Sequence, residues 1–252
     1  MTRHEEALLR EKFPEDEAFA AAALRLEHHE PLAYILGEWY FWRQTYLVNP
    51  DVLIPRADTE LLVERLVKIL PHGARFLDLC TGSGCIAIST LCERPDVTAL
   101  AVDLSQGALA VARENAKKCG VNDRCTFACA DVTDPAALSA LAEEGAFDVI
   151  VSNPPYIDTD VIPSLSPEVR SEPRMALDGG IDGMDFYRAI LKHARPLLWE
   201  GGIFLFEIGY DQREKITALS APLKCTVTCD YGGNPRCAMI EVPAAITEAS
   251  AL

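Results

Sequence analysis

Short apolar runs alternate with amphipathic stretches along most of the chain from about residue 74 onward. The runs resemble strands buried on both faces, and the stretches between them carry apolar residues at helical spacing. This alternation predicts a mostly parallel sheet with helices on both faces, an α/β fold. The predicted strands are RFLDLC, VTALAVDL, CTFACAD, FDVIVSN, GIFLFEIG, CTVTCDYG and RCAMIEV, and the predicted helices are CIAISTLCE, SQGALAVARENAKKCG, MDFYRAILKHARPLL and DQREKITALSA.

The beginning of the chain follows a different pattern. Residues 5–29 predict two helical pieces around Pro14, because proline interrupts a helix. The following segment, PLAYILGEWYFWRQTYLVNPDVLIPR, is rich in aromatic and β-branched residues. It predicts two strands joined by a turn at Asn49-Pro50-Asp51.

Asp58 precedes an amphipathic stretch, TELLVERLVKIL, and has the position of an N-cap for that helix. A boundary falls just before it. We therefore expect an N-terminal helical segment with a linking β-hairpin at residues 1–57, followed by the α/β domain at residues 58–252.

The composition is that of an ordinary globular protein, with 49% hydrophobic and 24% charged residues among 252. We find no apolar run close to the roughly 20 residues that span a bilayer, so we expect no membrane segment. The acidic, amphipathic start lacks the basic end and apolar block of a secretory signal, which favours a cytoplasmic location. Nine cysteines without a C-x-x-C pair favour buried structural thiols over zinc ligands or disulfides.

The formal net charge is −15. Binding to nucleic acid depends mainly on Lys and Arg side chains that neutralise phosphates, so this charge opposes a polyanionic partner. It does not exclude one, since a local basic patch can exist on an acidic protein. Solubility is the simpler interpretation of the charge.

A glycine-containing loop, DLCTGSGCIAI, joins the first strand of the predicted sheet to its helix. Gly82 and Gly84 let the backbone approach a ligand at the carboxyl ends of the strands, where open α/β sheets bind small molecules. Asp103 ends the next predicted strand, where its carboxylate can accept hydrogen bonds from ribose hydroxyls. Asp131 ends the third strand, where its carboxylate can meet an adenine amino group. The pattern predicts a cofactor that contains adenosine.

Two such cofactors remain open. GSGCIA satisfies the loose dinucleotide pattern G-x-G-x-x-G/A, which allows NAD. S-adenosylmethionine has no phosphate and favours an acidic residue before the loop, which holds its amino group directly or indirectly. Asp78 supplies such an acid, although a loop acid with a purely structural role would look the same.

The fourth predicted strand ends in Asn153-Pro154-Pro155-Tyr156, beside the cofactor loop. The Asn153 side-chain oxygen and the Pro154 carbonyl can accept both N–H groups of an amide or aromatic amine, and proline brings no competing backbone donor. The two prolines stiffen the loop, and Tyr156 can stack on a flat substrate. A strand stop with a core tyrosine is the structural alternative, but the position beside the loop favours catalysis at nitrogen.

Several stretches resemble the release factor glutamine methyltransferase family of class I, S-adenosylmethionine-dependent methyltransferases. They cover nearly everything after residue 30 and are PLAYILGEWYFW, LIPRADTELLVE, DLCTGSGCIAI, SNPPYI, EPRMALDGGIDGMDFYR and DYGGNPRCAMIE. The resemblance implies a doubly wound seven-stranded sheet with its last strand antiparallel. It also implies transfer of a methyl group from S-adenosylmethionine, leaving S-adenosylhomocysteine, to the N5 amide nitrogen of the glutamine in the Gly-Gly-Gln loop of peptide chain release factors.

The resemblance also assigns roles to residues of this sequence. It implies that the methionine part of the cofactor lies against Cys80, Thr81, Gly82, Ser83 and Gly84, after Asp78. Asp103 would hold the ribose, and Asp131 with Val132 the adenine. The glutamine would be held by Asn153, which also borders the cofactor, and by Pro154, Pro155 and Tyr156. No metal is implied, and we expect a monomer.

The chain departs from the family pattern in two places. Cys80 stands where most members have glycine, and the helical region before PLAYILG is shorter than the family's usual helical bundle, which helps recognise the substrate.

Glu172, Pro173 and Asp178 lie where a lid over the substrate would belong, although a surface loop is an equal interpretation.

Three other functions remain as alternatives. N-methylation of an adenine or guanine amino group in DNA or RNA is disfavoured by the acidic charge. An NAD-dependent oxidoreductase leaves Asn-Pro-Pro-Tyr unexplained. An inactive cofactor-binding scaffold would be favoured by a disrupted motif, and the motif is intact.

Overall fold

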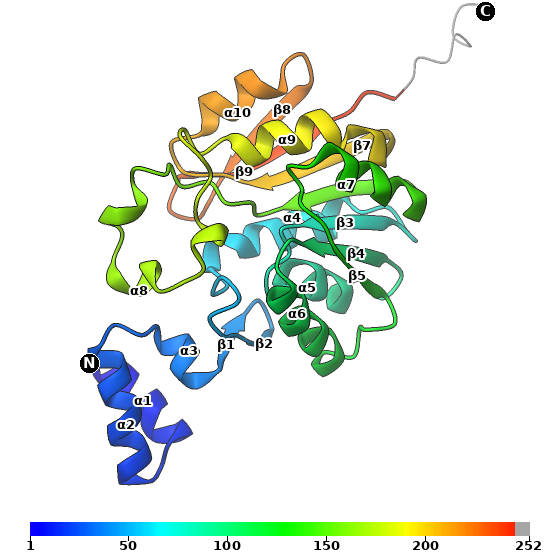
Figure 1. Cartoon of the computed structure of the whole chain (residues 1–252). Coiled ribbons are helices and arrows are strands. Elements are labelled where there is room, and N and C mark those ends of the chain that lie inside the picture. The colour runs from blue at the N-terminus through cyan, green and yellow to red at the C-terminus, as the bar shows by residue number, and fades with distance from the viewer. Residues whose placement is uncertain (245–252) are drawn as a thin grey trace, which may run out of the picture.

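The central sheet is mostly parallel (Figure 1). The computed structural model describes residues 1–244, and in this range seven strands join in the order β5 (Cys125–Cys129), β4 (Thr98–Asp103), β3 (Arg75–Leu79), β6 (Phe147–Ser152), β7 (Leu198–Glu207), β9 (Pro235–Glu241) and β8 (Lys224–Cys229). The pairs from β5 to β7 are parallel, and β9 is antiparallel to both neighbours. The expected sheet with an antiparallel last strand is confirmed.

Helices cover both faces of this sheet (Figure 1). Successive residues of a strand point to opposite faces, so Phe76 packs in the core under one helix layer and Leu77 in the core under the other. This two-sided burial explains why the strand sequences are continuously apolar. One layer consists of α4 (Glu60–Ile69), α5 (Cys85–Glu93) and α6 (Gln106–Lys118), and the other of α7 (Pro135–Ala140), α9 (Asp185–His193) and α10 (Arg213–Ser220).

The N-terminal helices form a small unit beside the sheet (Figure 1). They are α1 (Arg3–Lys12), α2 (Asp16–Glu27) and α3 (Leu32–Leu36). Leu9, Ala22 and Ile35 make their own buried cluster. The predicted break around Pro14 is confirmed. Every helix that the structure describes falls short of the length and apolar character of a membrane span.

A hairpin of β1 (Glu38–Phe41) and β2 (Gln44–Leu47) follows these helices. The prediction that its turn is Asn49-Pro50-Asp51 is wrong, because the strands turn at Trp42 and Arg43. Asn49 lies beyond β2, where its side-chain oxygen accepts a hydrogen bond from the Asp51 N–H at 2.9 Å. Asn49-Pro50-Asp51 has the turn-forming residue types and Trp42-Arg43 does not, so the pairing of the two strands, and not local chemistry, decides where the hairpin closes.

The predicted N-cap at Asp58 is also wrong. A turn of 3-10 helix, η1 (Ala57–Thr59), precedes α4. The Asp58 carboxylate instead lies 3.2 Å from the guanidinium of Arg236 on β9. The helix that was predicted to begin at Ser105 does begin there, as α6 (Gln106–Lys118), and the Ser105 hydroxyl caps it by accepting a hydrogen bond from the Ala108 N–H at 3.1 Å.

The irregular segment after β6 contains short helical turns. These are η3 (Ile162–Ser164), α8 (Pro167–Arg170) and η4 (Arg174–Ala176), and two further turns elsewhere in the chain are η2 (Leu141–Glu144) and η5 (Arg195–Leu197). An isolated bridge between Ile157 and Asp178 closes the segment on itself. The second half of this segment contributes Pro173, Met175, Ala176 and Asp178 to a cavity that residues at the carboxyl ends of the strands also line.

Candidate active site

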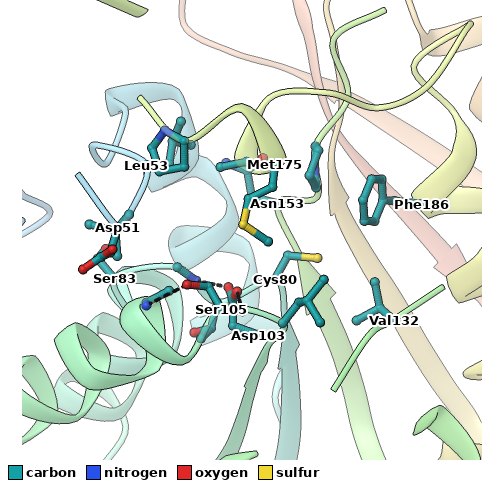
Figure 2. Close-up of a pocket in the computed structure, with 18 of the residues that line it drawn as sticks. Asp51, Leu53, Cys80, Ser83, Asp103, Ser105, Val132, Asn153, Met175 and Phe186 are labelled. Carbon is teal, nitrogen blue, oxygen red and sulfur yellow. Dashed lines mark hydrogen bonds between the residues drawn. The ribbon is translucent and has the colours of Figure 1, made fainter. Parts of the chain in front are cut away.

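A cavity opens at the carboxyl ends of β3, β4, β5 and β6, and we call it the main cavity (Figure 2). The chain runs from β3 outward to β5 and then returns to β6 on the other side of β3, so the cavity lies where the strand order reverses. In Figure 2, Asp103 and Ser105 lie on one side of it, and Leu53, Asn153 and Met175 on the other.

The glycine loop after β3 forms part of the cavity wall. Gly82 and Gly84 have φ values of +56° and +80°, a region that glycine adopts without strain. A Cβ atom on Gly82 would meet no other atom within 4 Å, so the ligand space is open above this backbone. A Cβ atom on Gly84 would lie 2.7 Å from the Ile88 side chain, because Gly84 caps α5 and packs tightly.

Cys80 occupies a left-handed conformation with a φ of +59°. This explains why glycine suits the position, since a side chain is strained there. Burial raises the pKa of the Cys80 thiol well above its ordinary value, and the carboxylate of Asp103 adds to this effect. The thiol lines the main cavity as a neutral, weakly polar group.

Asp103 at the end of β4 is held by two backbone groups. One oxygen accepts a hydrogen bond from the Gly82 N–H at 2.9 Å, and the other from the Ser105 N–H at 2.9 Å. Burial raises the pKa of Asp103, and these hydrogen bonds oppose the shift. Each oxygen keeps a lone pair, which suits a ligand with two neighbouring hydroxyls.

Asp131 and Val132 follow β5 and line the same cavity. One Asp131 oxygen accepts hydrogen bonds from the Thr133 N–H at 2.8 Å and from its hydroxyl at 2.6 Å. Val132 is buried, and Phe186 of α9 also lines this end of the cavity. A carboxylate beside apolar surface suits a flat, polar-edged ring.

Asp78 does not line the main cavity. It is completely buried, and its carboxylate accepts a hydrogen bond from the Thr81 hydroxyl at 2.7 Å. Burial raises its pKa to about 7. Asp78 therefore holds the loop from behind, so only an indirect effect on a ligand is compatible with its position.

The Asn-Pro-Pro-Tyr stretch separates the main cavity from a second, smaller one, which we call the side cavity. Asn153 lines both cavities, Pro155 lines the main cavity and Tyr156 lines the side cavity. Pro154 is buried between them and lines neither, and Gly84 also lies outside both linings. Leu53, Arg56 and Ala176 also line both cavities, so the two cavities adjoin around Asn153.

Polar groups support this stretch from behind. Asn153 Nδ2 donates a hydrogen bond to the Thr59 hydroxyl oxygen at 3.2 Å, and the Tyr156 hydroxyl donates to Glu207 Oε1 at 3.3 Å. Burial raises the pKa of Glu207 to about 7.

Several lining residues were not predicted from the sequence. Asp51, Leu53 and Arg56 come from the segment after the hairpin, and Met175 comes from the loop after β6. Residues on both sides of the predicted boundary at 57/58 therefore line one cavity. Leu53, Arg56 and Met175 lie in stretches that carried the family resemblance, so the only signal for them was the resemblance and not a motif of their own.

Glu172 ties these two segments together. Its carboxylate is buried, pairs with Arg56 and accepts a hydrogen bond from the Ile54 N–H at 2.9 Å. Asp178 accepts a hydrogen bond from Thr159 at 2.6 Å and lines the main cavity with Pro173. Glu172 thus braces the segment over the site, while Pro173 and Asp178 contribute to the wall.

Comparisons with known proteins show which family and fold this chain shares. Residues 56–165 match the family model "Methyltransferase small domain". A release factor glutamine methyltransferase of Caulobacter vibrioides is 44% identical over 198 residues, which are 77% of this chain and 66% of that relative. Another, of Salmonella typhimurium, is 43% identical over 218 residues, which are 84% of this chain and 76% of that relative.

The fold is also that of solved methyltransferases. The structure of ribosomal protein L11 methylase from Lactobacillus delbrueckii has a TM-score of 0.54 at 19% identity, over 78% of this chain and 84% of that chain. Fold and site therefore define a class I methyltransferase. The chain belongs to the release factor glutamine methyltransferase family, and it spans 66% of the length of the Caulobacter vibrioides relative.

Proposed function

We propose that this protein transfers a methyl group from S-adenosylmethionine to the side-chain amide nitrogen of the glutamine in the Gly-Gly-Gln loop of peptide chain release factors. The position of Asn153 carries the proposal. Its side chain borders both the main cavity, which suits the cofactor, and the side cavity, which suits the substrate.

The residues of the main cavity fit S-adenosylmethionine. Asp103 offers lone pairs to the two ribose hydroxyls, and Asp131 with Val132 suits the adenine. The open backbone at Gly82 leaves room for the methionine part. When bound, the cofactor supplies a methyl group on a positively charged sulfur.

The Asn-Pro-Pro-Tyr stretch prepares the amide nitrogen. The nitrogen lone pair of an amide is delocalised, so it attacks poorly unless it is held in line with the methyl group. Asn153 Oδ1 would accept one N–H group, and Tyr156 would stack on the amide plane. The second acceptor that the motif suggests is the Pro154 carbonyl, which would have to be reached past the cavity wall, because Pro154 lines neither cavity. The motif needs no strong base, because the nitrogen loses its proton as the methyl group transfers or afterwards.

The side cavity has chemistry suited to a peptide. Its wall is largely apolar, with Leu53, Ile157 and Leu177 among its residues, and it includes the charged groups Arg56 and Glu207. An aliphatic glutamine stem with an amide at its end matches such a wall. Since release factors act in the cytoplasm, the proposal includes a cytoplasmic location, and we propose that the protein acts as a monomer.

Labelled methyl transfer tests this function. The full-length protein and labelled S-adenosylmethionine are offered three substrates in parallel: a release factor, the same factor with the loop glutamine replaced, and DNA. We expect label only in the unchanged release factor. Label in DNA alone, or equal label in both release factors, would overturn the proposal.

A further inference from the structure

The acid that the sequence suggested for the amino group of the cofactor does not reach the main cavity. Asp78 is completely buried behind the glycine loop and lines neither cavity. S-adenosylmethionine carries an ammonium group at its amino acid end, with three hydrogen-bond donors and a full charge. When that group enters a cavity it loses water, so an acceptor in the cavity wall has to replace the lost hydrogen bonds.

Four carboxylates line the main cavity, those of Asp51, Asp103, Asp131 and Asp178. Asp103, Asp131 and Asp178 already accept hydrogen bonds from other groups of the protein. The Asp51 carboxylate has no hydrogen bond or ion pair among residues 1–244, since only the backbone N–H of Asp51 is bonded. Asp51 is therefore the lining acid that is left to pair with a cationic group of a ligand.

The backbone of Asp51 is fixed by the Asn49-Pro50-Asp51 turn. The Asn49 side-chain oxygen accepts a hydrogen bond from the Asp51 N–H at 2.9 Å, and the Asn49 carbonyl accepts one from the Val52 N–H at 3.1 Å. Val52 is buried, and its carbonyl accepts a hydrogen bond from the Tyr34 hydroxyl at 2.6 Å. The turn that does not close the hairpin thus holds Asp51 at the cavity wall.

The Asp51 carboxylate lies against the first turn of α6, where Gly107 leaves room for it. A Cβ atom on Gly107 would lie 2.7 Å from Asp51 Cγ and 2.9 and 3.0 Å from the two carboxylate oxygens. Glycine weakens a helix, and here it permits this close approach. The N-terminus of α6 also favours a negative charge. Gly107 does not line the main cavity, so a side chain at this position would act on Asp51 rather than on a ligand.

Asp51 lies at the end of the main cavity that the amino acid part of the cofactor would reach. In Figure 2, Val132 and Phe186 lie on one side of Asp103, and Asp51 lies on the other side. With the adenine at Val132 and the ribose at Asp103, the rest of the molecule extends away from Val132, toward Asp51. Because adenine and ribose are uncharged near pH 7, the ammonium group is the part of this end that attracts a carboxylate.

We infer that Asp51 binds the ammonium group of the cofactor's amino acid part. An Asp51 oxygen accepts a charge-assisted hydrogen bond from that group, and the proton stays on the nitrogen. The inference rests on the proposed function for the identity of the cofactor. It gives the segment before the predicted boundary at 57/58 a part in cofactor binding.

Isothermal titration calorimetry of the full chain with two probes tests the inference. S-adenosylhomocysteine has the ammonium group but no sulfonium charge, and its deaminated analogue has hydrogen in place of the ammonium group. For Asp51→Asn, we expect the Kd of S-adenosylhomocysteine to rise by roughly 5-fold to 30-fold, because a hydrogen bond between charged groups is weakened. We expect the Kd of the deaminated analogue to be the same in Asp51→Asn and wild type.

Gly107→Ala moves the carboxylate without removing it. The added Cβ displaces the Asp51 side chain from α6, and alanine favours the helix, so the variant folds. We expect the Kd of S-adenosylhomocysteine to rise in Gly107→Ala. The double variant with Asp51→Asn should bind no more weakly than Asp51→Asn alone, because both changes act on one contact.

Asp123→Asn is the matched control for the change in net charge. Asp123 is exposed in the turn before β5, whereas the main cavity lies at the carboxyl ends of the strands. We expect this variant to bind both probes as wild type does.

The outcomes separate this inference from the proposed function. Equal affinity of wild type and Asp51→Asn for S-adenosylhomocysteine overturns the inference, and so does an equal loss for both probes, which would show that Asp51 contacts another part of the molecule. A wild type that binds S-adenosylhomocysteine but leaves release factor unlabelled contradicts the proposed substrate, while the two probes still decide the role of Asp51. A wild type that binds neither probe contradicts both.

Discussion

The backbone N–H of Gly82 donates a hydrogen bond to the carboxylate of Asp103 across 2.9 Å. This contact ties the loop after β3 to the end of β4, so one side chain both shapes the glycine loop and faces the ligand space. The second oxygen accepts from the Ser105 N–H and fixes the carboxylate plane.

Asp103→Ala tests this double role. We expect S-adenosylmethionine to bind more weakly by about 1 to 3 kcal/mol, because hydrogen bonds to a charged group are lost. Isothermal titration calorimetry measures the change. The matched control is Asp123→Ala, because Asp123 is an exposed aspartate in the turn before β5. We expect this variant to keep wild-type affinity. Equal affinity in the two variants would remove Asp103 from the binding site.

Asn153→Ala tests the junction between the two cavities. We expect kcat for methyl transfer to fall by roughly 100-fold or more, because the acceptor that orients the substrate nitrogen is lost. Cofactor affinity, measured by calorimetry, is retained. The exposed Asn122 provides the control variant Asn122→Ala. Turnover that survives in Asn153→Ala would contradict the acceptor role.

The buried carboxyl of Asp78 makes stability depend on pH. Burial raises its pKa to about 7 in the folded protein, above its ordinary value in the unfolded chain. The folded state therefore keeps a proton that the unfolded state releases, and the associated stability is full below about pH 4 and lost as pH rises through 7.

Asp78→Asn removes this dependence. Between pH 5 and pH 7 the wild type loses this stability and the variant does not. We therefore expect the free energy of unfolding of the variant, relative to that of wild type, to rise by on the order of 1 to 2 kcal/mol over this range. Urea unfolding at several pH values measures the difference. Asp123→Asn, at an exposed site, keeps the wild-type slope. Parallel pH profiles for wild type and Asp78→Asn would show that Asp78 is ionised throughout.

Gly84→Ala tests the tight start of α5. The added Cβ would lie 2.7 Å from Ile88 and 3.2 Å from Ala112 at a φ of +80°. Overpacking and strain together predict a loss of about 2 to 4 kcal/mol. Gly37→Ala shares a positive φ of +73° but meets no atom within 4 Å, so it reports the strain alone. Chemical denaturation compares the two, and an equal loss in both would exclude the clash.

Much of the candidate site could be predicted because parallel strands bring their carboxyl ends to one edge. Asp103, Asp131 and Asn153 each end or follow a strand, so a strand assignment alone brings them together. The hairpin turn and the cap at Asp58 could not be predicted in the same way. Asn49 and Asp58 have suitable local chemistry, but strand pairing and the ion pair with Arg236 override it.

By itself, the sequence determined the alternation of strands and helices and the glycine loop, because these depend on local period and residue type. From residue type alone it also predicted nitrogen-binding chemistry for Asn-Pro-Pro-Tyr. Only the tertiary structure decided that Thr59 and Glu207 stand behind Asn153 and Tyr156. These contacts join residues 94 and 51 positions apart, and the pairing of buried polar groups depends on which elements pack together. Local pattern therefore identified the candidate stretch, and packing decided which polar groups lie behind it.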